Sequence, residues 1–520
     1  MPRVGRWRAT ASAMRECPQL RQMSGDKSPE GFPIPNMALT RPSQSAPLPR
    51  WARVLDVVCV LFAATAIVVS VSGGFRLRLG GIWIGMTTPY PLLLWSLLTG
   101  IGRHAAAPQQ PLLREGPRRL ADWLRTSAVR DATTTVAGTR PIIFFVGYLA
   151  VFMFGYANER PPLRHFDNEL LNLNVRWDAG WYLDIATGGY RFTPGERDVQ
   201  QNVVFFPAYP MLVRAGGRLL GGRVVAYVMA GTVISLAAFW GSLIYLYAFT
   251  RDALGRDTAR CALWLLATYP FALFFGGIYT ESLFLLGVIG AFYHFTNRQF
   301  GRAACWGGLV GLTRLNGALL SIPLLVLTVS RWLPARLVVR PGPAAEAWNP
   351  SIAIGERTFA KALAAAVMPP VGLLIHAVFI WRMTGDATAW ATGHAAWGRT
   401  YEGLGSLVAN EFSVLAASGL SGTAAYDAVN AIGAAFALAA VWPVARRMGL
   451  AYALFILINV LPALSVGGFL SAGRFSSVLF PAFVWLAEVV PAAHRAGWIA
   501  SFAAFQACNA ALFYTWRPMF

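Results

Sequence analysis

Long apolar segments alternate with short polar links along most of the chain. Several approach or reach the roughly 20 residues that an α-helix needs to cross a bilayer. The clearest are Leu55–Gly73, Ile82–Ile101, Pro141–Ala157, Val224–Phe249 and Leu450–Phe469. Hydrophobic residues make up 56% of the 520 residues and charged residues only 13%, whereas a soluble domain carries about a quarter charged residues. The pattern therefore predicts an all-α polytopic membrane protein.

The chain carries a formal net charge of +20. Its basic residues fall in short links between apolar segments, as the positive-inside bias predicts. Basic patches interleaved with aromatic residues, which are typical of RNA-binding modules, are absent. The 5 cysteines are scattered and show neither a disulfide framework nor a metal-binding spacing. We therefore expect membrane lipids as partners, and no nucleic acid, metal or cofactor.

The arginines divide the chain into four parts. Residues 1–54 are predicted to be a disordered basic cytoplasmic tail, and residues 55–101 a transmembrane hairpin. Residues 102–140 read as a basic cytoplasmic linker, and residues 141–520 as the main transmembrane domain. Because the span that follows the linker crosses outward, we expect a multi-pass protein of the plasma (inner) membrane with a cytoplasmic N-terminus.

Two outer segments stand out. Residues 158–201 form the most acidic stretch of the chain, and residues 382–424 are rich in Gly and Ser. A loop as long as 158–201 is unusual where most other links are short, and such loops are commonly functional. The active face is therefore predicted to be the outer, periplasmic or extracellular one.

Two apolar stretches conflict with the positive-inside pattern if each crosses once. Pro207, Pro210 and Arg214 interrupt Val203–Leu220, which we expect to dip into the membrane or lie at its interface. Ala303–Val329 is expected to be a pair of short helices broken around "TRLNG", residues 313–317. Broken backbone at membrane depth is tolerated only where protein or water satisfies it. Arg314 and Asn316 are therefore predicted to face a cavity.

The stretch "RWDAGWYLDIATGGY", residues 176–190, concentrates charge and aromatic rings between apolar segments. Read as an interfacial helix, it aligns Trp177, Trp181 and Asp184 on one stripe. Asp178 and Tyr182 fall on the adjacent stripe, from which Asp178 would face the space between spans. One interpretation is a membrane anchor with solvated aspartates. A pure anchor gains little from a carboxylate between tryptophans, which favours a catalytic helix.

Two further motifs carry candidate chemistry. In "NVVFFPAYP", Tyr209 lies between two prolines that fix a bend, although an ordinary loop-to-span junction has the same appearance. In "TYPFALFFGGIYTESLF", Glu281 is placed at the outer end of two antiparallel spans. Its carboxylate either serves the site or belongs to the cap of the following helix.

Two arginines lie within apolar segments. Arg314 occurs in "LTRLNG" and Arg474 in "SAGRFSSVLFP". A charge inside a span is costly and marks a functional site unless the side chain reaches the interface, an alternative that suits Arg474 better. A guanidinium group is well suited to bind phosphate.

These motifs resemble, in the same order, those of the PIG-V-like mannosyltransferases of the GT-C superfamily. The resemblance rests on "RWDAGWYLDIATGGY", "FFPAYP", "FFGGIYTESLF", "LTRLNG" and "GRFSSVLFPAF", and it extends from about Pro141 to the C-terminus. It implies a GT-C-type bundle of about 11–13 transmembrane helices, in which the acidic outer loop bears interfacial helices. The chain is compatible with a bacterial member of the family.

The resemblance also implies a function. It implies metal-independent transfer of a sugar, mannose in this family, from a polyprenyl-phosphate donor to a lipid-linked, glycan or protein acceptor, with inversion. Asp178 matches the family's general base. A phosphate leaving group needs no partner acid. The expected substrate-binding residues are Trp177, Trp181, Tyr182, Asp184, Tyr209, Glu281, Arg314, Asn316 and Arg474.

Two other functions remain open from the sequence. A glycolipid transporter or flippase would account for intramembrane arginines and broken helices, but the halves of the chain show no internal repeat of the kind common in transporters. A non-catalytic assembly subunit would share the fold, yet the acidic motif is intact. Loss of transfer in an Asp178→Asn protein, or lipid scrambling without transfer, would discriminate among the three.

Overall fold

The structure is a computed structural model that describes residues 50–79, 82–106, 120–157, 165–196, 199–330, 348, 356–399, 401–418, 423–466, 468–469 and 471–517. All of them belong to one unit, Pro49–Phe520. The predicted tail, 1–54, lies almost entirely outside the described residues. So do parts of the predicted linker and of both predicted outer loops.

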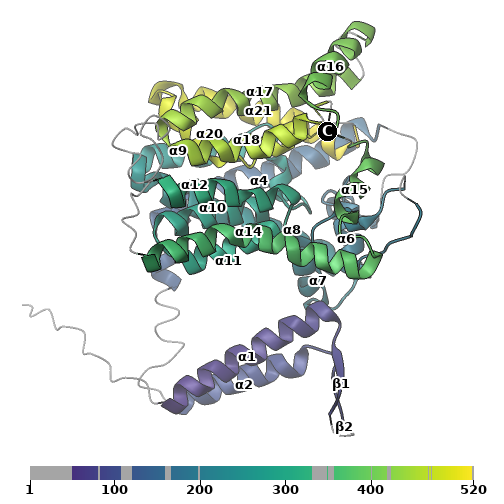
Figure 1. Ribbon diagram of the computed structural model, residues 1–520, viewed down its shortest axis with the longest axis vertical. Coiled ribbons are helices and arrows are strands. Elements are labelled where there is room, and N and C mark those ends of the chain that lie inside the picture. The colour runs from purple at the N-terminus through teal and green to yellow at the C-terminus, as the bar shows by residue number, and fades with distance from the viewer. Residues whose placement is uncertain are drawn as a thin grey trace, which may run out of the picture. The chain divides into compact units, whose positions relative to one another are not determined.

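The described secondary structure is helical apart from one β-hairpin (Figure 1). Six helical segments are long and apolar enough to cross a membrane. They correspond to the helices α1 (Arg50–Ser72), α4 (Ser127–Phe154), α8 (Val224–Leu254), α14 (Glu356–Thr384), α17 (Thr423–Arg447) and α21 (Arg495–Tyr514). Shorter apolar helices include α10 (Glu281–Thr296), α18 (Leu450–Leu464) and α20 (Phe480–Val489). The predicted helical multi-pass class is confirmed, and a total of 11–13 spans stays a prediction.

The predicted N-terminal hairpin contains an unpredicted pair of strands. Strands β1 (Phe75–Leu79) and β2 (Ile82–Met86) pair antiparallel, with Phe75 opposite Met86. The second helix, α2, therefore runs from Tyr90 to Ala106, and the expectation of one span over Ile82–Ile101 was wrong. The alternation in "FRLRL" has the period of a strand, which competes locally with the helical pattern.

Helix α4 also begins earlier than predicted. Thr126 caps it by accepting a hydrogen bond from the Val129 backbone N–H. Residues 127–140 are therefore helical and continuous with the predicted span, and the position of the linker 102–140 relative to the membrane stays a prediction. Pro141 lies inside α4 and removes one backbone hydrogen bond. The helix nevertheless continues past it to a total length of 28 residues.

Polar side chains satisfy the broken backbone between α9 (Arg256–Thr268) and η2 (Ala272–Gly276). The buried Arg140 of α4 donates to the carbonyls of Ala267 and Ala272, each at 2.6 Å. Gln506 of α21 donates to the carbonyls of Ala267 and Tyr269. Such side chains stand in for water inside an apolar fold. They fix the segment that leads to Glu281, the first residue of α10.

The predicted break in Ala303–Val329 is present. Helix α11 (Phe300–Gly311) ends before Arg314, whose backbone is extended with φ −156° and ψ 156°. The chain resumes as η3 (Leu315–Leu320) and α12 (Ser321–Val329). In the other stretch in question, Val203–Leu220, the helix α7 (Ala208–Leu219) has only 12 residues. It is too short to cross a bilayer, and its depth in the membrane stays a prediction.

Helices α11 and α14 cross at backbone contact. A Cβ atom on Gly311 would lie 1.9 Å from the Pro369 carbonyl oxygen, and one on Gly372 would lie 2.3 Å from the Gly308 carbonyl oxygen. Both distances are far below van der Waals contact, and the obstructing atoms are backbone. Only glycine therefore permits this crossing, which holds α14 against the broken helix that carries Arg314.

Gly311→Ala is expected to lower the free energy of unfolding by about 1–3 kcal/mol, because the methyl group forces the two helices apart. Gly308→Ala is the matched control, since its Cβ atom would meet only the flexible end of Met368 at 3.6 Å. Unfolding midpoints in mixed detergent micelles measure the difference. Equal midpoints for the two variants would show that the crossing tolerates a side chain at Gly311.

Candidate active site

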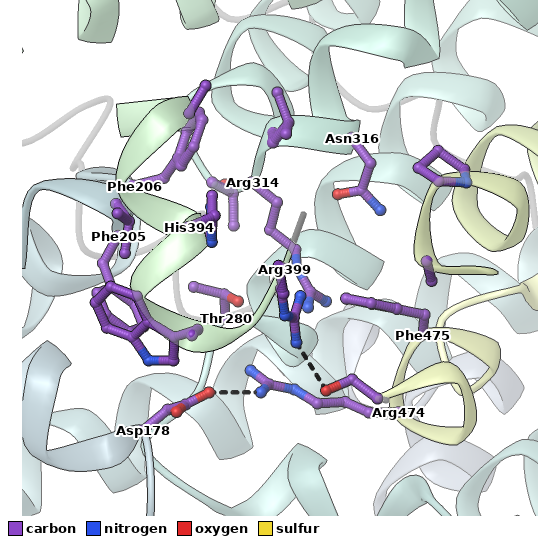
Figure 2. Close-up of a pocket in the computed structure, with 18 of the residues that line it drawn as sticks. Asp178, Phe205, Phe206, Thr280, Arg314, Asn316, His394, Arg399, Arg474 and Phe475 are labelled. Atoms are coloured by element: carbon purple, nitrogen blue, oxygen red, sulfur yellow. Dashed lines mark hydrogen bonds and ion pairs between the residues drawn. The ribbon is translucent and has the colours of Figure 1, made fainter. Parts of the chain in front are cut away.

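A cavity of about 950 Å³ is lined by several chain segments, four of which supply its charged side chains or the residues beside them. These are the start of α6 (Ala179–Gly188), the break before η3, the segment of α15 (Ala389–Thr392) and η5 (Gly393–Trp397), and α19 (Ala472–Ser476). The two predicted outer segments thus contribute to one site. Figure 2 shows Asp178, Arg314, Arg399 and Arg474 converging inside it.

Asp178 immediately precedes α6 and lines the cavity. Its Oδ2 atom lies 2.7 Å from Nη1 of Arg474, as the dashed line in Figure 2 marks. Its Oδ1 atom has no hydrogen-bond partner among the described residues, and 27% of the side chain is exposed. One carboxylate oxygen is therefore fixed, and the other is available to a substrate hydroxyl.

The backbone before Asp178 differs from the predicted helix. Trp177 has φ 52°, a left-handed conformation that costs a non-glycine residue about 1–3 kcal/mol. Its indole packs on Trp516 at 5.1 Å between ring centroids, and its Nε1–H donates to the Phe513 carbonyl. Trp177 is therefore not on the helix with Trp181, and the predicted stripe is wrong at this position. It still lines the cavity, as do Trp181 and Tyr182.

Asp184 and Tyr209, both predicted to bind substrate, do not line the cavity. Asp184 pairs with Arg191, whose pKa the contact raises, and accepts a hydrogen bond from Asn202 at 2.8 Å. Tyr209 is fully buried and donates its hydroxyl to the Gly231 carbonyl at 2.9 Å. Both side chains are occupied by internal contacts that fix the first outer segment and α7.

Glu281 lies behind the cavity wall and joins two arginines. Its Oε1 atom pairs with Nε of Arg474 and lies 3.1 Å from Nη2 of Arg314. Glu281 is fully buried and absent from the cavity lining, so the predicted contact with substrate is not what its position supports. Arg314 and Arg474 do line the cavity, and Arg474 is only 4% exposed, which excludes the alternative in which it reaches the interface.

Arg399 comes from the second predicted outer segment and was not among the predicted site residues. Its Nη2 donates to Oγ of Ser471 at 2.9 Å, and Ser471 has a left-handed backbone with φ 62°. Burial and the nearby Arg474 lower the pKa of Arg399 to about 10, so it remains charged at neutral pH. The pKa of His394 is lowered to about 4, first by burial and then by Arg399, so His394 is neutral. Neither residue interrupts an apolar span, which was the signal that identified the other two arginines.

The cavity has walls of different character. Trp181, Phe205 and Trp397 form a cluster of half-buried rings on the side of Asp178, with Trp181 and Phe205 stacked at 5.8 Å. Asn316 lies on another part of the wall and donates to Asn459 at 2.6 Å. Figure 2 shows Phe205 and Asn316 on opposite sides of the arginines. Apolar side chains continue the lining there, namely Leu315, Leu319, Leu373, Pro462, Ala463 and Val466.

This arrangement favours an amphiphilic anion. Three guanidinium groups face the cavity, and the carboxylates of Asp178 and Glu281 offset two of their charges. Within the described part of the chain, no group of three or more His, Cys, Asp or Glu side chains is placed to hold a metal ion. The fold and site thus define a multi-pass membrane protein with a carboxylate–arginine site beside an apolar wall.

One part of the chain matches a known family. Residues 163–341 match the family model described as Mannosyltransferase (PIG-V). Over this part of its length the chain is similar to the PIG-V mannosyltransferases, the family that the motifs resemble. Asp178, Glu281, Arg314 and Asn316 lie in the matched region, and Arg474 lies outside it. No curated protein matches the chain.

Among solved structures, the chain is similar to the oligosaccharyltransferase of Archaeoglobus fulgidus. The structure with Zn and sulfate has 14% identity and a TM-score of 0.35, and the alignment covers 71% of this chain and 53% of that one. The structure of the archaeal oligosaccharyltransferase AglB from Archaeoglobus fulgidus with an inhibitory peptide and a dolichol-phosphate has 14% identity and a TM-score of 0.36, and the alignment covers 74% of this chain and 55% of that one. The chain thus spans about half the length of these proteins.

Proposed function

We propose that this protein transfers mannose from a polyprenyl-phosphate donor to a hydroxyl of a lipid-linked or glycan acceptor, with inversion and without a metal ion. The reaction takes place at the outer face of the plasma membrane. The main support is the Asp178 carboxylate, which lines a cavity together with three arginines. One of its oxygens contacts Arg474, and the other has no hydrogen-bond partner among the described residues.

Asp178 is the general base. Its Oδ1 accepts the proton of the acceptor hydroxyl while the oxygen attacks the anomeric carbon from the face opposite the phosphate. The hydrogen bond from Arg474 to Oδ2 fixes the carboxylate plane, so that little reorientation is needed during transfer. The rings of Trp181, Phe205 and Trp397 line the same side of the cavity and suit the apolar face of a sugar.

The arginines stabilise the leaving group. The bond from the anomeric carbon to the phosphate oxygen breaks with its electron pair on the phosphate, which departs as an anion without a proton donor. Arg314 is well placed for this role because its Nη1 is buried and has no hydrogen-bond partner. The apolar wall that begins at Leu315, the next residue, suits the adjoining prenyl chain.

The orientation has structural support. Helix α10 begins at Glu281 beside the cavity, and the basic residues Arg298 and Arg302 follow its other end. Since basic residues favour the cytoplasmic side, the cavity is assigned to the outer side. The acidic segment 158–201 and the Gly- and Ser-rich segment 382–424, both expected outside, contribute residues to this cavity.

A transfer assay tests the proposal. Purified protein in nanodiscs is given polyprenyl-phosphate-mannose or GDP-mannose together with a panel of lipid-linked and soluble glycans, with a chelator present throughout. We expect transfer from the lipid donor alone, with the anomeric configuration inverted in the product by NMR. Flipping of a glycolipid between leaflets without any transfer would instead establish a transporter.

A further inference from the structure

The cavity contains one positive charge that no carboxylate offsets. Arg474 pairs with Asp178 and Glu281, and Arg314 pairs with Glu281. Arg399 forms no ion pair among the described residues; its guanidinium hydrogen-bonds only to the neutral hydroxyl of Ser471. An uncompensated, largely buried cation is costly unless an anion joins it.

Arg399 and Arg314 lie close together although one comes from the second outer segment and the other from the helix break. Both guanidinium groups lie against the ring of Phe475, at 5.7 Å for Arg399 and 4.9 Å for Arg314. Figure 2 shows the two side chains converging in the middle of the cavity beside Phe475. Nη1 of Arg314 is buried without a hydrogen-bond partner, so donor capacity remains on this pair.

We propose that Arg399 and Arg314 form a clamp that recognises the leaving phosphate as a monoester dianion, with Arg399 as the specificity-determining residue. The inference rests on the proposed function, since that function supplies the phosphate. The clamp distinguishes product from donor, because the donor phosphodiester carries one negative charge and the released phosphate monoester carries two.

The charges of the site balance through the reaction. Before transfer, the three arginines and two carboxylates sum to one positive charge, which matches the monoanionic donor. During transfer, the acceptor oxygen bonds to the anomeric carbon, the phosphate leaves with the electron pair, and Asp178 takes the proton. Asp178 is then neutral, so the site carries two positive charges opposite a dianion. Protonation of the base and formation of the second phosphate charge therefore favour each other.

The experiment measures binding of two short probes by isothermal titration calorimetry in nanodiscs. One probe is geranyl phosphate, a monoester, and the other is its methyl ester, which keeps a single charge at every pH used. At pH 8 we expect wild type to bind the monoester roughly tenfold more tightly than the methyl ester, as one extra charge-assisted contact provides. At pH 5, below the second phosphate pKa of about 6, the two affinities should become similar.

The methyl ester serves as an internal control for changes in the protein's own charge between pH 8 and pH 5. Asp178, Glu281, Arg314, Arg474 and His394 surround the clamp. Any change in their charge acts on both probes, and the methyl ester reports it. His394 stays mainly neutral at pH 5, because its pKa is about 4.

Arg399→Ala should abolish the discrimination at pH 8, because it weakens binding of the monoester roughly tenfold more than binding of the methyl ester. Arg399→Lys, which keeps the charge, should retain part of it and provides a second variant if the first folds poorly. Arg191→Ala is the matched control, an outer arginine with an ion pair outside the cavity. Full discrimination in both Arg399 variants would overturn the proposal. The result does not depend on transfer, so it can fail or hold separately from the proposed function.

Discussion

Asp178→Asn is expected to lower the rate of mannosyl transfer by a factor of roughly 10²–10⁴, the usual contribution of a general base. The amide has nearly the shape of the carboxylate, and its oxygen can still accept the hydrogen bond from Arg474. It cannot take the proton of the acceptor hydroxyl. Initial rates at saturating donor and acceptor should therefore show the loss in kcat, with a much smaller change in KM for the donor.

Asp184→Asn is the matched control for this experiment. Asp184 lies on α6, the helix that Asp178 precedes, but it pairs with Arg191 and does not line the cavity. We expect its kcat to stay within a few-fold of wild type. Transfer by Asp178→Asn at the wild-type rate would remove Asp178 from the role of base, and equal losses in both variants would indicate damage to α6.

Much of the candidate site could be predicted because its charged residues occur in apolar or aromatic segments, where a charge is unusual. Arg314 and Arg474 interrupt apolar segments, and Asp178 separates residues that would otherwise form a plain aromatic anchor. Arg399 gave no such signal, because an arginine in a polar outer segment is ordinary. Its role arises from a contact with Ser471, 72 positions later in the chain, which no local pattern encodes.

The same limit explains why some of the predicted substrate-binding residues do not line the cavity. Glu281 is the first residue of its helix, but its partner Arg474 lies 193 positions away. The sequence therefore could not show that the Glu281 carboxylate forms ion pairs with arginines and does not face the cavity. Tyr209 was singled out by its prolines, yet its hydroxyl is satisfied by α8 through Gly231.

The prediction of one transmembrane helix failed where two periodic patterns compete. The span expected at Ile82 contains a strand first, since "IWIGM" is apolar in either reading and only its pairing with "FRLRL" decides. Conversely, the break at Arg314 was predictable, because a buried charge and a glycine within one apolar segment both disfavour a continuous helix.

Glu281→Ala is expected to produce the largest loss of stability, about 3–5 kcal/mol, because it leaves two largely buried arginines without their shared counter-charge. Glu281 is fully buried, and the side chains of Arg314 and Arg474 are 11% and 5% exposed. Arg474 keeps Asp178 as a partner, whereas Arg314 loses its only ion pair among the described residues. Unfolding midpoints in mixed micelles at neutral pH measure the loss.

Glu488→Ala is the comparison variant, because it removes a partly exposed ion pair instead of a buried one. Glu488 lies 2.7 Å from Arg447, but these side chains are 26% and 44% exposed, so solvent screens the pair and its removal should cost at most about 1 kcal/mol. Adding Arg314→Met to Glu281→Ala should recover part of the lost stability, because it removes the stranded charge while keeping an apolar side chain of similar length. Two results would contradict this prediction: equal destabilisation by Glu281→Ala and Glu488→Ala, or a further loss of stability when Arg314→Met is added. Either result would mean that Glu281 does not stabilise the two arginines and that another interaction stabilises the cationic wall of the cavity.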